Sequence, residues 1–196
     1  LHRVDRRQRQ MCIRDRIGGY MQIFLSTLTE VDYERSLDSI EQNYDQDPEM
    51  SWKERARVKN LRKSENYNSE LEVIAKNDTN DVIGHVLLGE ILLVSNNHQT
   101  TALAVGALSV QPDVREQGLG KALMQAVEER AKAEGYPAIF VHCYTEFFNH
   151  IGYVDAKQYD IVMEELGNDD TLSVKFLTSD IASLHGMTVM LPEVFD

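Results

Sequence analysis

The stretch that decides the fold is Leu108–Ala122, with the sequence LSVQPDVREQGLGKA. It joins a predicted strand, 101–110, whose small apolar residues suit coverage on both faces, to a segment whose apolar residues recur with the helical period. Gly118 and Gly120 fall in the first turn of this helix, where the missing Cβ atoms let backbone amides approach a ligand. A helix N-terminus favours an anion such as a pyrophosphate. The turn therefore either binds a pyrophosphate or uses glycine for its conformation alone.

Five successive amides are the candidates for anion binding: those of Gln117, Gly118, Leu119, Gly120 and Lys121. Two other phosphate motifs do not fit the turn. A dinucleotide fingerprint needs a glycine where Leu123 stands, and a P-loop needs Ser or Thr where Ala122 stands. The sequence also has no HExxH, paired CxxC or GxSxG motif, so we expect no metal.

The segments around this unit predict a mixed sheet. Expected strands span 22–28, 71–75, 82–94, 101–110, 138–143, 159–163, 173–177 and 187–191. Expected helices span 29–43, 51–61 and 119–134, with a short turn at 146–150. Residues 44–49 are expected to form a loop, after which Ser51 and Glu54 form a capping box. A meander followed by a strand–helix–strand crossover predicts an α/β fold (an α+β mixed sheet) with helices on both faces.

The composition narrows the function classes. The chain has 196 residues, of which 42% are hydrophobic and 27% charged, so it is a globular domain rather than a disordered or repetitive chain. Its net charge of −12 argues against nucleic acid as a partner. No apolar stretch is long enough to span a membrane. Two cysteines, Cys12 and Cys143, make no disulfide framework, so we expect a cytoplasmic protein.

The first sixteen residues, LHRVDRRQRQMCIRDR, differ from the rest of the chain. They show no helical or strand period and no apolar targeting region, and they resemble a translated sequencing adapter; a basic arm is the alternative. We expect residues 1–20 to be a non-native or disordered extension and 21–196 to be a single domain. Without the six Arg and two Asp of residues 1–16, the net charge changes from −12 to −16.

The sequence resembles the GNAT superfamily of N-acetyltransferases. The pattern RxxGxG at 115–120, preceded by VxP at 110–112, looks like that family's acetyl-CoA loop, and FFNHIGY at 147–153 looks like the segment after its next strand. Three further segments are similar to a bacterial subgroup of small acetyltransferases: 61–64, 82–85 and 191–195. The resemblance covers 21–196, with an acetyl-CoA core of about 82–155.

The resemblance implies a splayed, mostly antiparallel sheet with acetyl-CoA between the strands that end at Val110 and near His142. It assigns the pantetheine arm to the backbone of Leu108, Ser109 and Val110, and the pyrophosphate to the amides of 117–121. Two side chains, Arg115 and Asn149, are also assigned to acetyl-CoA.

The implied reaction is direct transfer of the acetyl group to a primary amine in a ternary complex, with a small molecule or peptide as the acceptor. The alternative is an acyl-CoA-binding module with little or no transfer. The oligomeric state stays open, with a homodimer as one alternative.

The proton-handling groups are the least defined part of the expected site. Phe148 occupies the position of the family's usual tyrosine acid, so either Tyr144, the nearest substitute, or solvent protonates the thiolate; Tyr153 is a weaker candidate. For the general base we choose Glu90, against the alternative of an outward-facing, solvated carboxylate. Two further residues are kept in reserve, His142 and Glu146.

The segment 30–64 is expected to cover the acceptor cleft. Its acidic residues Asp45, Asp47 and Glu49 favour a cationic amine, although such a cluster also suits a solvated loop. A peptide N-terminus, a lysine, a polyamine and an aminoglycoside all stay open as acceptors.

Overall fold

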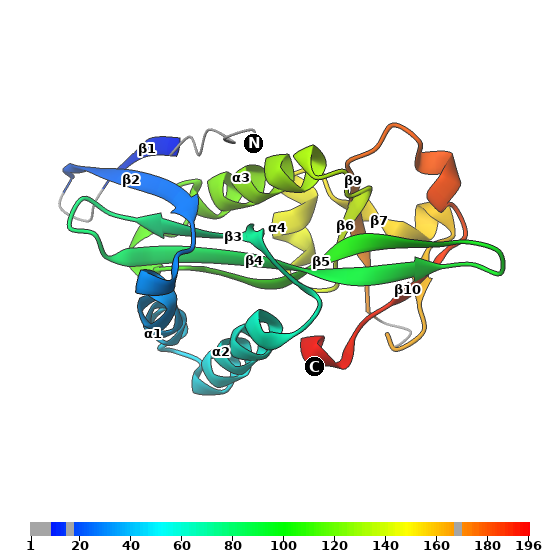
Figure 1. The fold of residues 1–196 in the computed structure, drawn as a ribbon. Coiled ribbons are helices and arrows are strands. Elements are labelled where there is room, and N and C mark those ends of the chain that lie inside the picture. The colour runs from blue at the N-terminus through cyan, green and yellow to red at the C-terminus, as the bar shows by residue number, and fades with distance from the viewer. Residues whose placement is uncertain (1–8, 15–17, 167–169) are drawn as a thin grey trace, which may run out of the picture.

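The computed structural model describes residues 9–14, 18–166 and 170–196, and its main feature is one twisted mixed sheet (Figure 1). The main run of the sheet has the order β1-β2-β3-β4-β5-β6-β9-β7, with β10 paired to β4 and β8 paired to β10. The strands are β1 (Arg9–Arg14), β2 (Tyr20–Thr27), β3 (Tyr67–Lys76), β4 (Val82–Val94), β5 (Gln99–Val110), β6 (Ala138–Val141), β7 (Val154–Asp155), β8 (Val162–Met163), β9 (Ser173–Phe176) and β10 (Thr188–Met190).

Helices cover both faces of the sheet. They are α1 (Tyr33–Asn43), α2 (Pro48–Lys63), α3 (Leu119–Ala133) and α4 (Thr145–His150). Figure 1 shows α3 and α4 on one face and α1 and α2 on the other. Each face has its own apolar core, one including Leu123 and Val127 of α3 and the other including Val58 and Leu61 of α2. The predicted fold class is therefore confirmed.

The sheet opens between β5 and β6. These parallel strands pair only at Leu103 with Ile139 and Ala104 with Phe140, whereas β5 pairs with β4 along its length, as far as Val110. The expected meander and the expected crossover through α3 are both present. The opening therefore lies at the end of β5, directly before the turn that leads into α3.

Three expected elements differ from the structure. Arg9–Arg14 forms the edge strand β1, with Ile13 buried, where we expected no regular structure. Helix α2 begins at Pro48 rather than at Ser51, because Asp47 caps it by accepting a hydrogen bond from Met50 N at 3.1 Å. The strand expected at 159–163 shortens to Val162–Met163, because a 3₁₀ turn occupies Ala156–Tyr159.

A buried ion pair fixes α2 to the sheet. Arg62 Nη2 lies 2.6 Å from Glu72 Oε1 on β3, and Tyr67 Oη donates to Glu72 Oε2 at 2.7 Å. Burial alone would raise the pKa of Glu72, but hydrogen bonds and charge from His85 and Arg62 outweigh it and lower the pKa to about 2. The Glu72 carboxylate therefore stays ionised across the ordinary pH range.

We expect Glu72→Gln to lower the free energy of unfolding by about 3–5 kcal/mol, because it leaves Arg62 buried without its counter-ion. Urea unfolding checks this, with the exposed Glu65→Gln as the control. Since the folded-state pKa of Glu72 is depressed, the stability it gives is lost as the pH falls from about 4.5 to about 2. The free energy of unfolding of Glu72→Gln should therefore not show this decrease at low pH. A variant as stable as the parent at neutral pH would contradict the prediction.

Candidate active site

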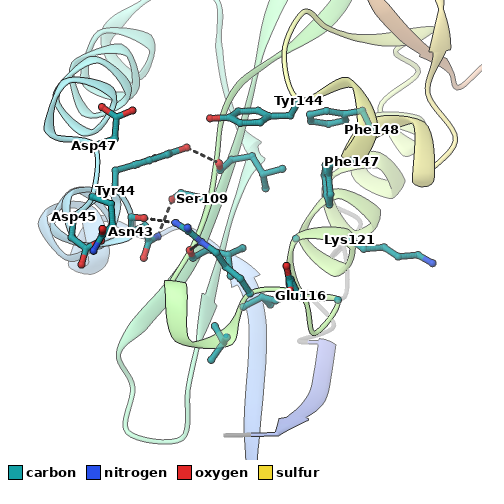
Figure 2. A pocket seen from close by; sticks show the side chains of 18 residues that line it. Asn43, Tyr44, Asp45, Asp47, Ser109, Glu116, Lys121, Tyr144, Phe147 and Phe148 are labelled. Atoms are coloured by element: carbon teal, nitrogen blue, oxygen red, sulfur yellow. Dashed lines mark hydrogen bonds between the residues drawn. The ribbon is translucent and has the colours of Figure 1, made fainter. Parts of the chain in front are cut away.

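A cavity of about 490 Å³ lies where β5 and β6 part (Figure 2). Four segments line it: 43–47 at the end of α1, 108–110 of β5, residues 114–121 except Gln117 at the start of α3, and Tyr144, Phe147 and Phe148 at the start of α4. Segments far apart in the sequence thus meet at the opening in the sheet.

The end of β5 turns polar backbone groups toward this cavity. Gln111 N donates to Ile83 O on β4 at 2.8 Å. Hydrogen-bonded and non-hydrogen-bonded residue pairs alternate along two antiparallel strands, so at this end the odd-numbered residues of β5 bond to β4 and the even-numbered residues do not. The N–H and C=O groups of Leu108 and Val110 therefore point away from β4. Figure 2 shows one result, in which Tyr44 Oη donates to Leu108 O at 3.2 Å.

Two charged side chains contact the same strand edge. Glu54 Oε1 accepts a hydrogen bond from Leu108 N at 3.2 Å, and Arg115 Nε donates to Val110 O at 3.1 Å. Arg115 also donates to Asn43 O, while Asn43 Nδ2 donates to Ser109 Oγ at 3.0 Å. The strand edge is therefore held against α1 and α2 by side-chain hydrogen bonds.

The start of α3 presents amides to the cavity. Gly118 is the N-cap residue with φ of 86°, a left-handed conformation that favours glycine, and it makes no side-chain cap. The first bond of the helix runs from Ala122 N to Gly118 O at 3.0 Å, so the preceding amides have no partner within the helix. A Cβ on Gly120 would approach the Phe147 ring at 3.4 Å, whereas one on Gly118 would meet no atom within 4 Å. This N-terminus is shaped to accept an anion.

Most residues predicted for the site line the cavity. They are Leu108, Ser109, Val110, Arg115, Gly118, Leu119, Gly120, Lys121 and Tyr144. In Figure 2, however, the Lys121 side chain extends away from Asn43 and Tyr44, which leaves its backbone as the part nearest the cavity.

Three predicted residues lie outside the cavity lining. The side chain of Gln117 accepts a hydrogen bond from Arg14 N at 2.7 Å, and Asn149 is exposed on α4. Glu90 accepts a hydrogen bond from Tyr136, which packs with the α3 core. The structure thus does not bring Glu90, our choice of base, to this cavity, because its position in β4 directs it to the face opposite α2.

Phe147 and Phe148 of α4 pack against Tyr153, which lies just before β7. Phe148 is 1% exposed, and its ring makes edge contacts with Phe147 and Tyr153 at centroid distances of 5.1 and 5.0 Å. Tyr153 Oη donates to Glu128 Oε1 at 3.1 Å, and burial raises its pKa well above the usual range. Tyr153 therefore faces α3, away from the cavity.

Tyr144 is the tyrosine of this connection that lines the cavity. Its backbone is left-handed, with φ of 52°, and Figure 2 shows its ring opposite that of Tyr44. Burial raises the pKa of Tyr144, with further contributions from Cys143 and Glu54. The hydroxyl therefore carries its proton at neutral pH.

Sequence reasoning missed Glu54, which is not among the cavity-lining residues but accepts a hydrogen bond from the backbone N of Leu108, which is. Glu54 is only 6% exposed, and one oxygen, Oε2, is buried without a hydrogen-bond partner in the described part of the chain. Burial raises the pKa of Glu54, while His85 opposes the rise. A signal was present in the sequence, because Glu54 lies at helical spacing with the apolar Val58 and Leu61 that form the buried face of α2.

The comparisons with known proteins agree with this architecture. The acetyltransferase (GNAT) family matches residues 37–153, more than half of the chain. The chain belongs to this family. No curated protein matches it. Within the described residues, no helix is long and apolar enough to cross a membrane, and no group of three His, Cys, Asp or Glu could hold a metal.

Solved GNAT structures share the fold. The GNAT family N-acetyltransferase YhbS from Escherichia coli, in complex with CoA, matches with a TM-score of 0.75 and 18% identity over 99% of this chain and 96% of that chain. A GNAT family acetyltransferase from Brucella melitensis, in complex with acetyl-CoA, matches with a TM-score of 0.68 and 15% identity over 89% of this chain and 98% of that chain.

The electrostatics of the site predict that the Cys143 thiol reacts slowly with alkylating reagents. Although Cys143 is exposed as a residue, desolvation of its thiol by neighbouring groups raises its pKa to about 11, against the opposing effect of Arg57. Since only the thiolate reacts, iodoacetamide should alkylate Cys143 about 100-fold more slowly at pH 7.5 than a free thiol of pKa near 9. The rate, followed by mass spectrometry in a Cys12→Ser background, should still rise with pH above pH 9. Alkylation at the rate of a free thiol would contradict this.

Proposed function

We propose that this chain transfers an acetyl group from acetyl-CoA to a primary amine, and that residues 21–196 form the transferase domain. Membership of the family and the CoA and acetyl-CoA complexes of the two solved relatives support the use of acetyl-CoA. The observation that carries the proposal is the single cavity that connects the polar edge of β5 with the open N-terminus of α3.

The cavity suits an extended thioester with a pyrophosphate at one end. The amides at the start of α3 would bind the pyrophosphate, assisted by the positive end of the helix dipole. The N–H and C=O groups of Leu108 and Val110 would bind the pantetheine arm as a strand would. Arg115 holds this edge in place through Val110 O and Asn43 O.

Glu54 is the group best placed to act as general base. When the pantetheine arm takes the Leu108 edge, Glu54 and Tyr44 give up their hydrogen bonds to that residue, and both Glu54 oxygens become available. A buried carboxylate with a raised pKa is a stronger base than an exposed one, which suits removal of a proton from an amine near neutral pH.

Direct attack by the amine is favoured over an acetyl-cysteine intermediate. Cys143 is the cysteine beside the site, and a thiol pKa of about 11 leaves it protonated and weakly nucleophilic. The hydroxyl of Tyr144, which stays protonated, would give its proton to the departing thiolate. A backbone amide of the β5 edge that the pantetheine arm leaves free would stabilise the oxyanion.

We expect Gly118→Asp to weaken acetyl-CoA binding at least tenfold by calorimetry, because its carboxylate repels the pyrophosphate at the helix N-terminus. Gly135→Asp is the matched control. Gly135 follows the same helix with φ of 87° against 86° at Gly118, and a Cβ at either position meets no atom within 4 Å. Both variants carry the same backbone strain, so equal affinities would reject the assigned loop.

A second experiment separates Glu90, the base chosen from the sequence, from Glu54, the base proposed here. Glu54→Gln keeps an oxygen to accept from Leu108 N but removes the proton acceptor, so single-turnover acetyl transfer should slow about 100-fold. Glu90→Gln should change it less than about threefold, because Glu90 bonds Tyr136 away from the cavity.

If Glu90→Gln slows single-turnover transfer strongly and Glu54→Gln does not, Glu90 is the general base and the assignment of Glu54 is rejected. If the parent binds acetyl-CoA but no amine in a broad library accelerates thiol release, the chain is an acyl-CoA-binding module instead.

A further inference from the structure

A second set of buried polar groups lies behind Glu54, between the sheet and helices α1 and α2. His85 on β4 and Glu72 on β3 are both 0% exposed, and His85 Nε2 lies 2.7 Å from Glu72 Oε1. Arg62 and Tyr67 complete the coordination of the Glu72 carboxylate. The ion pair between Arg62 and Glu72 accounts for the attachment of α2 to the sheet, but it does not require a histidine.

The hydrogen bonds fix the tautomer of His85. Glu72 is held as a carboxylate by its partners, so it has only acceptor oxygens. The ring nitrogen that faces it, Nε2, must therefore carry hydrogen and donate. In the neutral ring, Nδ1 is then the basic nitrogen with a free lone pair. A carboxylate that orients a histidine in this way also stabilises the ring when it takes a second proton.

The basic nitrogen, His85 Nδ1, is one of two buried polar atoms in this region that lack a hydrogen-bond partner among the described residues. The other is Glu54 Oε2. The two groups are close in the fold. His85 pairs with Ser109 across the sheet, and Glu54 bonds the amide of the adjacent residue, Leu108. Two unsatisfied buried polar atoms on one side of a sheet are costly unless a shared water or proton joins them.

We propose that His85, oriented by Glu72, is a positioning residue that receives the acceptor amine's proton through Glu54. This inference rests on the proposed function. The N–H bond of the attacking amine breaks as Glu54 Oε2 takes the proton. That proton then passes by way of a water molecule to His85 Nδ1, which forms an imidazolium beside the Glu72 carboxylate. After the product leaves, the proton returns through Glu54 to solvent.

The charged groups around Glu54 and His85 favour the transfer of the proton from Glu54 to His85. The titratable and charged groups around Glu54 and His85 are Tyr44 directly after α1, Arg57 and Arg62 of α2, Tyr67 and Glu72 of β3, and Cys143 and Tyr144 before α4. A proton on His85 gives the ring a positive charge that favours the ionised form of Glu54, so moving the proton onto the histidine restores a carboxylate next to the reacting amine. Glu54 is thereby kept ready to act as a base although it is buried.

The first test examines the histidine ring by nitrogen NMR in the parent protein. The expected result is hydrogen on Nε2 and none on Nδ1 in the neutral ring. Glu54→Gln should change the pH dependence of the His85 ring signals, whereas Glu41→Gln, at an exposed position of α1, should not. Hydrogen on Nδ1, or signals indifferent to Glu54→Gln, would overturn the inference whether or not acetyl transfer is detected.

The second test follows single-turnover transfer across the pH range. His85→Gln can keep an amide donor for Glu72 but cannot take a proton, so we expect transfer about tenfold slower or more. The acidic limb of the profile should also move to higher pH, because the variant cannot form the imidazolium charge that favours the ionised form of Glu54. The affinity for acetyl-CoA should stay unchanged.

A matched control disturbs the same cluster away from Glu54. Ser36→Ala removes the hydroxyl that accepts from Arg62 Nη2 at 2.7 Å, so it should lower stability and leave the pH profile as in the parent. A His85→Gln profile that coincides with the parent's, with only stability lowered, would reduce His85 to a packing role. If the parent transfers acetyl to no amine, the proposed function fails, and the NMR test decides separately whether Glu54 and His85 are coupled.

Discussion

The constraint on which the site depends is that the backbone polar groups of β5 after Ala104 need hydrogen-bond partners. From there on β6 no longer pairs with β5, yet the N–H and C=O groups of Leu108 and Val110 still point toward the opening. Buried peptide groups must find partners. In this structure the partners are side chains, namely Glu54, Tyr44 and Arg115. The same need for partners makes the edge suitable for a ligand that offers a strand-like pattern of polar groups.

This constraint also explains the arrangement of α1 and α2. The two helices cover one face of the sheet beside the opening (Figure 1). Glu54 of α2 and Tyr44, directly after α1, reach the edge of β5 at Leu108. Glu54 is buried because the helix that carries it must also place Val58 and Leu61 in the core. The chain thus places a carboxylate at the β5 edge as a consequence of how α2 packs, and burial then raises the pKa of that carboxylate.

The sequence was sufficient for the fold and for the α3 end of the site. The strands around 82–110, the helix after Gly118 and the parting of β5 from β6 all follow from local patterns and from the family resemblance. The base was not predictable in the same way. Glu90 lies on a long strand whose two faces both read as apolar, so alternation does not reveal which face it takes, and Tyr136 binds it on the α3 side. Glu54 was hidden because it was interpreted as the capping-box partner of Ser51 in the first turn of a helix, whereas α2 begins at Pro48 and places Glu54 on its buried face.

The replacement of the usual tyrosine by Phe148 has a physical counterpart in the packing. The Phe148 ring is enclosed between Phe147 and Tyr153 and is almost fully buried, so a hydroxyl added there would need a partner inside an aromatic cluster. Four residues earlier, Tyr144 adopts a left-handed backbone conformation that is uncommon for a residue with a side chain. Its ring lines the cavity opposite Tyr44, while the residue stays 58% exposed (Figure 2). A phenol is thus present on the α4 side of the opening, supplied from the connection before the helix while the helix itself contributes only packing.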